Sequence, residues 1–116
     1  MLQHLSPELF KERIADFEGN DKWSFKCDVP TIILFKKQEH ILAKGFRDIY
    51  EPINQNFPDV KTYEVLVDEN PEIPTAYEID SFPSTMFIKP GAKAKIINGF
   101  LTPAEAINDV RDYLFE

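Results

Sequence analysis

The segment from Thr31 to Phe35 reads Thr-Ile-Ile-Leu-Phe and is the longest mostly apolar run in the chain. A run of apolar and β-branched residues without polar alternation is typical of a strand that is buried on both faces. Five residues fall far short of the roughly 20 that a helix needs to cross a bilayer. The run therefore predicts a central β-strand, and the rest of the chain must supply elements that cover both of its faces.

Helix and strand signals alternate along the rest of the sequence. The first helix is expected to begin at Ser6-Pro7-Glu8, where Ser can cap the helix and Pro suits its first position, and to run to the stop signal at Gly19-Asn20. The last helix carries a capping box, with Thr102 as the cap and Glu105 three residues later. Between these helices we expect a helix from about 40 to 56, which Pro52 kinks or ends, and then a strand over 63–67. A short helix capped by Asn70-Pro71 follows and reaches Tyr77. Two strands over 85–88 and 93–97 are joined by a turn at Pro90-Gly91.

This order of elements predicts the architecture, with a further short strand near residues 2–5. Right-handed crossovers make the first strands parallel, and the hairpin adds an antiparallel edge. The sequence therefore predicts an α/β fold in which a central mixed sheet of four to five strands has helices on both faces. A chain of 116 residues suits a single domain over residues 1–116 with one hydrophobic core.

The charge balance argues against two classes of partner. The net charge is −7 and the isoelectric point is about 4.8. Nucleic acids and anionic membranes both require clustered positive charge, so we expect neither as a partner. We interpret Lys89, Lys93 and Lys95 as a solvated hairpin. Residues 1–6 lack the basic and long apolar regions of a signal peptide, which favours a cytoplasmic location.

Cys27 is the only cysteine, so an intramolecular disulfide and a cysteine-only metal site are both impossible. His4 and His40 lie far apart in sequence and have no cysteine at metal-ligand spacing. The 4 glycines are spread along the chain and form no phosphate-binding loop. We therefore expect no metal and no cofactor.

The C-terminal two-thirds of the chain resembles the thioredoxin family through the joint spacing of several short motifs. They are Val67-Asp68-Glu69-Asn70-Pro71, Tyr77 with Ile79, Ser81-Phe82-Pro83-Ser84-Thr85, Phe87-Ile88-Lys89-Pro90-Gly91 and Asn98-Gly99-Phe100. The match continues without a gap from about residue 64 to 114, and residues 23–30 resemble the longer approach to the central strand in some bacterial thioredoxins. The resemblance implies a thioredoxin fold with a cis-proline loop at Pro83, and X-Pro bonds tolerate the cis form far better than other peptide bonds.

The same resemblance locates an active-site corner that lacks its cysteines. In the family, the Cys-x-x-Cys motif begins five residues after the phenylalanine that ends the central strand, and counting from Phe35 leads to His40-Ile41-Leu42-Ala43. Dithiol exchange needs a thiolate that attacks a disulfide and a second thiol that resolves the mixed disulfide. The buried acid of the family corresponds to Leu34, and its neighbouring lysine corresponds to Glu64. We therefore expect no catalytic residue and no redox activity.

A binding surface does not need sulfur. In thioredoxins the backbone beside the cis-proline pairs with an extended substrate strand, which is a form of β-augmentation. The resemblance implies one apolar groove formed by Phe82, Pro83, Ser84, Gly99 and Phe100 together with the tip at His40 and Ile41. The leading hypothesis is a redox-inactive thioredoxin-like protein, a monomer or weak dimer, that binds an extended peptide or protein partner through this groove. The alternative for the groove is that it has no ligand.

Two enzymatic alternatives remain open. Cys27 could act as the lone thiol of an oxidoreductase in cell redox homeostasis, although Asp28 offsets the neighbouring Lys26 and a partly buried structural cysteine is the more ordinary interpretation. His40 could take part in non-redox chemistry as a neutral base, nucleophile or hydrogen-bonding group, because a helix N-terminus disfavours the imidazolium. The sequence places no acid, serine or cysteine to form a relay with His40, which favours an exposed helix-start residue.

Overall fold

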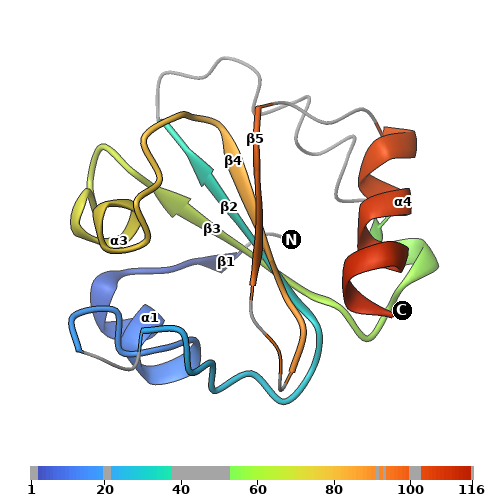
Figure 1. Ribbon diagram of the computed structural model, residues 1–116, viewed down its shortest axis with the longest axis horizontal. Coiled ribbons are helices and arrows are strands. Elements are labelled where there is room, and N and C mark those ends of the chain that lie inside the picture. Colours follow the sequence, from blue (N-terminus) through green and yellow to red (C-terminus); the bar gives the residue numbers. More distant parts are fainter. Residues whose placement is uncertain are drawn as a thin grey trace.

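The computed structural model describes residues 3–19, 22–37, 53–90, 92, 94–99 and 103–115. Five strands form one sheet, and their spatial order is β1 (Gln3–His4), β3 (Lys61–Leu66), β2 (Thr31–Lys36), β4 (Ser84–Ile88) and β5 (Lys95–Asn98) (Figure 1). Both β1 and β2 run parallel to β3, while β4 runs antiparallel to β2 and to β5. The predicted mixed sheet is confirmed, and β2 lies at its centre.

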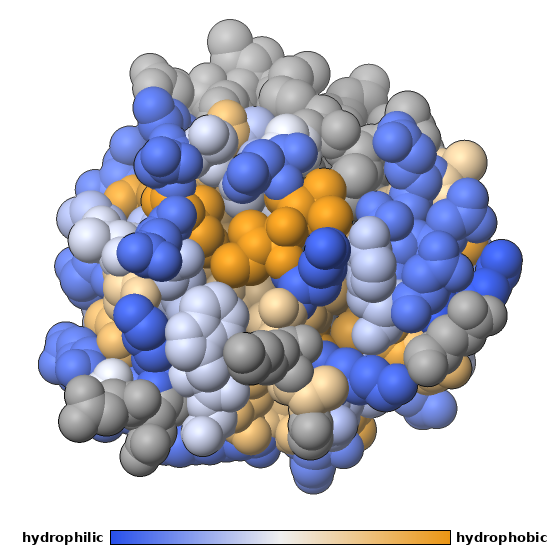
Figure 2. All heavy atoms as spheres, in the orientation of Figure 1, coloured by the Kyte–Doolittle hydropathy of each residue, from blue (hydrophilic) through white to orange (hydrophobic). Residues whose placement is uncertain are grey.

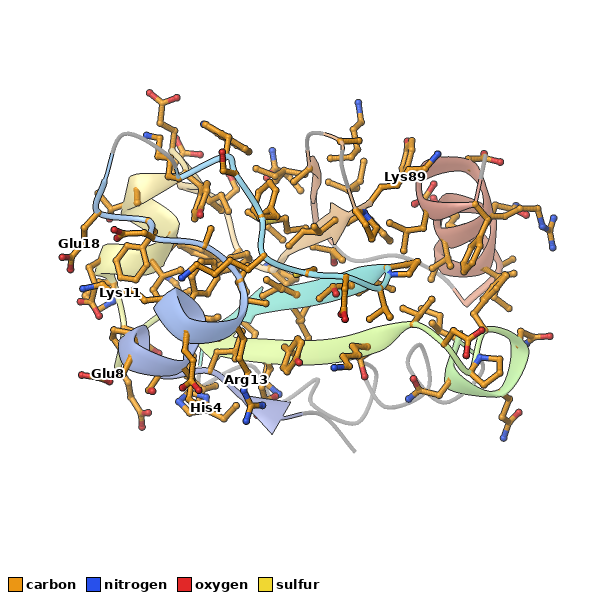
Figure 3. All side chains as sticks on the ribbon, turned by 90° about the horizontal axis from the view of Figure 1, so that it is seen from below. His4, Glu8, Lys11, Arg13, Glu18 and Lys89 are labelled. Carbon is orange, nitrogen blue, oxygen red and sulfur yellow. The ribbon has the colours of Figure 1, made fainter. Side chains whose placement is uncertain are left out.

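Helices cover both faces of the sheet. One face carries α1 (Pro7–Arg13) and α3 (Glu72–Ala76), and the other carries α4 (Pro103–Leu114) with a helical turn at residues 53–56. Figure 3, turned by 90°, shows β2 and β3 passing between α1 and α3 at one side and α4 at the other. The helices on both faces that the sequence predicts are thus confirmed.

The side chains of β2 explain why two layers are needed. Successive residues of a strand point to opposite faces, so Ile33 and Phe35 enter the cluster beneath α1 and α3, while Ile32 and Leu34 enter the cluster beneath α4. All four side chains are at most 1% exposed. Burial of a side chain of this size stabilises the fold by about 1.5–3 kcal/mol. The apolar run therefore contributes buried side chains to both cores, as its composition predicts.

The first helix ends earlier than its apolar spacing predicts. It begins at Pro7, and the Ser6 side chain accepts a hydrogen bond from the Leu9 N–H as expected, but it ends at Arg13. The carbonyl of Ile14 accepts the N–H of Lys26 at 2.7 Å, a partner from outside the helix. Lys11 and Glu18, both labelled in Figure 3, form an ion pair of 2.9 Å across the turn that follows. The predicted end at Gly19 is therefore wrong: the Ala15 N–H bonds to the carbonyl of Phe10 instead of the carbonyl of Lys11, which accepts the ammonium of Lys26 at 2.6 Å.

The short third helix is capped differently from the prediction. Its N-cap is Pro71, which provides no side-chain hydrogen bond, and Asn70 does not cap it with its side chain. The Asn70 Nδ2 instead donates to the carbonyl of Leu66 at 3.1 Å, while the Asn70 carbonyl accepts from Ile73 at 3.3 Å. Asn70 is only 6% exposed, and its side-chain amide hydrogen-bonds to Leu66, the last residue of β3, rather than to the start of α3.

The remaining boundaries lie close to those predicted. The strand expected over 63–67 covers 61–66, and the last helix buries Ala106, Val110 and Leu114, while Ile107 is only partly buried. Of the helix expected over 40–56, only the turn at 53–56 falls within the described residues, and Thr102 lies outside them. In the described part of the chain, no helix has the length and apolar character that a membrane crossing requires.

Candidate functional site: the surface beside cis-Pro83

The loop before β4 carries a cis peptide bond between Phe82 and Pro83, the geometry that the resemblance implies. Ser84, the next residue, begins β4 and pairs with Phe35 of β2 on one side and with Asn98 of β5 on the other. Because β2 runs parallel to β3 and antiparallel to β4, Pro83 lies at the end of the sheet where β2 and β3 finish. That is the end at which the family resemblance implies the active-site corner.

Hydrogen bonds to β5 hold this loop in place. The Gly99 N–H donates to the carbonyl of Pro83 at 2.7 Å, and Gly99 has a φ of +93°, a region that favours glycine. The Oγ of Ser84 lies within hydrogen-bonding distance of the Ser81 carbonyl and of Asn98 Oδ1, the latter at 2.9 Å. A hydroxyl has a single proton, so Ser84 can donate to one of these oxygens at a time.

The residue before cis-Pro83, Phe82, has a main chain with no partner in the described part of the chain. Among the described residues, none hydrogen-bonds to the N–H or the carbonyl of Phe82. Its side chain is partly buried and packs against the cluster beneath α1 and α3. The neighbouring Pro83 carbonyl is already occupied by Gly99. The arrangement thus presents one residue with a donor and an acceptor beside a rigidly held proline.

The structure places Phe82, Pro83, Ser84 and Gly99 at one end of the sheet. The Ser84 side chain is fully buried, so it can support the loop but cannot itself contact a ligand. The other predicted site residues are His40, Ile41, Leu42, Ala43 and Phe100, and they lie outside the described residues.

Leu34 and Glu64 are register partners on neighbouring strands at the same end of the sheet. Leu34 is 1% exposed and lies in the apolar cluster beneath α4. The carboxylate of Glu64 instead pairs with the ammonium of Lys36 at 2.8 Å, and these side chains are 18% and 13% exposed. Sequence reasoning missed Lys36, although it lies two residues beyond Leu34 and therefore on the same face of β2. Leu34 therefore provides no proton-transfer group at this buried position, and the charges of Lys36 and Glu64 pair with each other.

Cys27 lies at the opposite end of the sheet, before Thr31 begins β2. The five steps from Thr31 to Lys36 along β2, at a rise of about 3.3 Å each, span about 17 Å and separate Cys27 from the cis-proline loop. Its thiol lies 3.8 Å from the carbonyl of Arg13, in hydrogen-bonding range. It lines an open polar pocket of about 330 Å³ with Glu12, Arg13, Ile14, Lys26, Asp28, Val29, Thr31, Lys61 and Tyr63.

We expect the Cys27 thiol to react slowly with Ellman's reagent near neutral pH. Burial raises the pKa of this thiol, and the hydrogen bond with Thr31 and the charge of Lys61 oppose the shift only in part. Because the thiolate is the reactive form, the rate at about pH 7.5 should be lower than that of the free peptide Lys-Cys-Asp in the same buffer. It should approach the peptide rate as the pH rises above the ordinary thiol range.

The raised pKa of Cys27 also makes the stability of the folded protein depend on pH. The folded state holds the Cys27 proton more tightly than the unfolded state, so this contribution is complete below the ordinary thiol pKa and is lost as the pH rises through the raised pKa. The Cys27→Ser variant provides the reference, because it should lack that alkaline loss.

The reaction with Ellman's reagent has its own contrary outcome. Equal reaction rates for the folded protein and the peptide at about pH 7.5 would show that the thiol is not shielded.

Comparisons with known proteins agree with this geometry. The family model Thioredoxin matches residues 42–112, which begins after the first two positions of the His40-Ile41-Leu42-Ala43 corner. The thioredoxin of Borreliella burgdorferi is 28% identical over 110 residues, which cover 94% of each chain. The thioredoxin of Rickettsia bellii is 34% identical over 67 residues, which cover 57% of this chain and 64% of that protein.

Solved structures show the same fold. The chloroplastic thioredoxin z has a TM-score of 0.74 at 22% identity, covering 96% of this chain and 92% of the other. Thioredoxin O2 of Arabidopsis thaliana, in its oxidised state, has a TM-score of 0.73 at 19% identity, covering 99% and 95%. The family match over more than half of the sequence, with the sheet order and the cis-proline loop, shows that this chain belongs to the thioredoxin family.

Proposed function

We propose that this protein is a redox-inactive member of its family that binds an extended peptide through the main chain of Phe82. The observation that carries the proposal is the free N–H and carbonyl of Phe82 beside cis-Pro83, unpaired among the described residues. A donor and an acceptor on one residue match the pairing pattern of an added strand. The loop is held by Gly99 and needs no cysteine for that pairing.

The sulfur content supports the redox-inactive part of the proposal. Dithiol exchange needs two thiols that can reach the same substrate disulfide, and this chain has a single cysteine. Cys27 lies at the far end of β2 from Pro83, and burial raises the pKa of its thiol, which lowers the thiolate fraction at neutral pH. A lone-thiol oxidoreductase acting at the cis-proline surface is therefore disfavoured by position and by ionisation.

Apolar side chains on the side of the sheet that carries α1 and α3 would give the peptide a surface to pack against. Phe25, Phe82 and Ile96 are partly exposed hydrophobic residues on the same side of the sheet, and Trp23, whose ring centroid lies 6.1 Å from that of Phe25, is 39% exposed. In the view of Figure 2, which looks onto the β5 edge of the sheet, apolar atoms gather near the centre of the molecule. An extended peptide that pairs with Phe82 would place alternate side chains toward this surface.

The test uses a capped six-residue peptide of alternating valine and threonine as the probe. We expect calorimetric binding of this peptide and a loss of affinity of about tenfold when one central peptide nitrogen is methylated, because the bound strand then loses a main-chain donor. Methylation of the terminal nitrogen is the matched control and should have little effect. Equal affinity for the centrally methylated and the parent peptide would rule out strand pairing, and the absence of binding by the parent would rule out the function.

A further inference from the structure

The polar cavity of about 330 Å³ lies at the end of the sheet opposite to the cis-proline loop. It is lined by the starts of β2 and β3, by the segment 26–29 and by the end of α1. Lys26 ties this segment to the helix, because its N–H donates to the carbonyl of Ile14 at 2.7 Å and its ammonium to the carbonyl of Lys11 at 2.6 Å. Pockets that bind small molecules begin at about 300 Å³, so the cavity has room for a small ligand.

The hydroxyl of Tyr63 faces this cavity without a hydrogen-bond partner. Tyr63 lines the cavity from β3, is 7% exposed, and belongs to the apolar cluster beneath α1 and α3. None of the described residues hydrogen-bonds to its hydroxyl. Among the described side chains, the sealed polar atom that lacks a partner is Nδ1 of His4, so the Tyr63 hydroxyl keeps its opening toward the cavity. A tyrosine buried to this degree usually has a partner for its hydroxyl, and here a ligand can supply it.

Charges of both signs surround this hydroxyl, with the positive ones in excess. The charged residues among the described lining are the cations Arg13, Lys26 and Lys61 and the carboxylates Glu12 and Asp28. In the described part of the chain, Lys61, Glu12 and Asp28 form no ion pair. The lining therefore carries a positive excess on a chain whose net charge is −7.

We propose that this cavity binds an acidic amino acid. Such a ligand carries two carboxylates and one ammonium at neutral pH, which is the reverse of the charge excess in the lining. In this arrangement the carboxylates face Lys26 and Lys61, the ammonium faces Glu12 or Asp28, and the Tyr63 hydroxyl donates to a carboxylate inside the cavity. The cavity lies at the other end of β2 from the peptide-binding surface, so the inference does not depend on the proposed function.

The Cys27 thiol lies in the same cavity and can report its occupancy. It is 3.8 Å from the carbonyl of Arg13, and burial raises its pKa, so at neutral pH the thiol adds no negative charge to the lining. Bound ligand should slow the alkylation of Cys27 by iodoacetamide at about pH 8.5, where part of the thiol is ionised. Iodoacetamide is uncharged, so the ligand does not act on it through simple charge repulsion.

The experiment titrates L-glutamate into the full chain at low salt and measures the heat of binding. L-Glutamine, which lacks the side-chain carboxylate, and glutarate, which lacks the ammonium, are the matched comparisons. We expect each of them to bind about threefold or more weakly than glutamate, because each loses one kind of charge contact. Glutamate should also slow the alkylation of Cys27 more than glutamine does at the same concentration.

Two variants with matched controls locate the ligand. Tyr63→Phe should bind glutamate about tenfold more weakly, because a hydrogen bond to a charged group is lost, and its thermal stability should stay that of the parent, since the hydroxyl has no partner in the described part of the chain. Tyr113→Phe, on α4, is its control. Lys61→Gln should lose about threefold in affinity. Its control Lys89→Gln has the same formal charge of −8 instead of −7, and Figure 3 shows Lys89 far from Arg13.

Each contrary result overturns a defined part of the proposal. No heat of binding up to about 10 mM glutamate would overturn it outright. Equal affinities for glutamate, glutamine and glutarate would overturn the assignment to acidic amino acids. If Tyr63→Phe and Lys61→Gln bind like their controls, or if glutamate leaves the alkylation of Cys27 unchanged, the ligand does not occupy this cavity and the site is refuted. None of these results bears on peptide binding at the cis-proline loop.

Discussion

A variant that carries His40→Cys and Ala43→Cys is expected to catalyse the reduction of insulin disulfides by dithiothreitol, whereas the parent chain is not. The two substitutions restore Cys-x-x-Cys five residues after Phe35. Phe35 is fully buried and pairs with Ser84, the residue after cis-Pro83. The first thiolate would attack a substrate disulfide and release one substrate thiolate, and the second would displace the other, leaving a protein disulfide that dithiothreitol reduces.

The rate of the double variant should exceed the dithiothreitol blank but stay below that of a thioredoxin with an intact cysteine pair. The reason is Leu34, which supplies no proton-transfer group at the position of the family's buried acid. General acid–base catalysis typically contributes about 10²–10⁴-fold. The rate of insulin precipitation, followed by turbidity, measures the effect.

Single substitutions are the matched controls for this experiment. His40→Cys alone should form a mixed disulfide without turnover, because no second thiol resolves it. Adding Cys27→Ser to the double variant should leave its rate unchanged, since Cys27 lies at the other end of β2. Turnover by the parent at the rate of the double variant would contradict the redox-inactive proposal, and an inert double variant would contradict the placement of the corner.

The elements that could be predicted from the sequence are those that local signals determine. The apolar run over 31–35 predicts a strand buried on both faces, and Ser6-Pro7 predicts the start of α1, because a cap and a first-turn proline act within one helical turn. The cis-proline loop could be placed by family resemblance. Each of these inferences depends on residues that lie within a few positions of one another.

Features set by distant contacts could not be predicted in this way. At the end of α1 the carbonyls of Lys11 and Ile14 both accept hydrogen bonds from Lys26, which is distant in sequence. The side chain of Asn70 does not cap α3 because its Nδ2 donates to the carbonyl of Leu66. The Lys36–Glu64 pair requires the register of two strands, which the sequence does not state. The free main chain of Phe82 likewise appears only once the bonds of its neighbours to β5 are known.

Replacement of Leu34 by aspartate is expected to cost about 5 kcal/mol or more in unfolding free energy at neutral pH. Removing a buried leucine side chain alone costs about 2–5 kcal/mol, and an uncompensated buried carboxylate adds several kcal/mol. Leu34 is 1% exposed and packs in one cluster with Ile32, Ile53 and Phe87. Because domains of this size are stable by only about 5–15 kcal/mol, this variant should lie close to unfolding. Urea denaturation followed by far-ultraviolet circular dichroism measures the loss.

The Leu34→Asn variant isolates the charge from the packing, because its side chain has the same shape without the ionisable group. Burial should raise the pKa of the introduced carboxyl, so the folded state favours its protonated form. The stability of the aspartate variant is then greatest below the ordinary carboxyl pKa and is lost as the pH rises through the raised value. The two variants should therefore be about equally stable near pH 3 and diverge toward pH 7. If they remain equal at every pH, the carboxylate is being neutralised in place, which would require Lys36 to leave Glu64 and would contradict a dry core at this position.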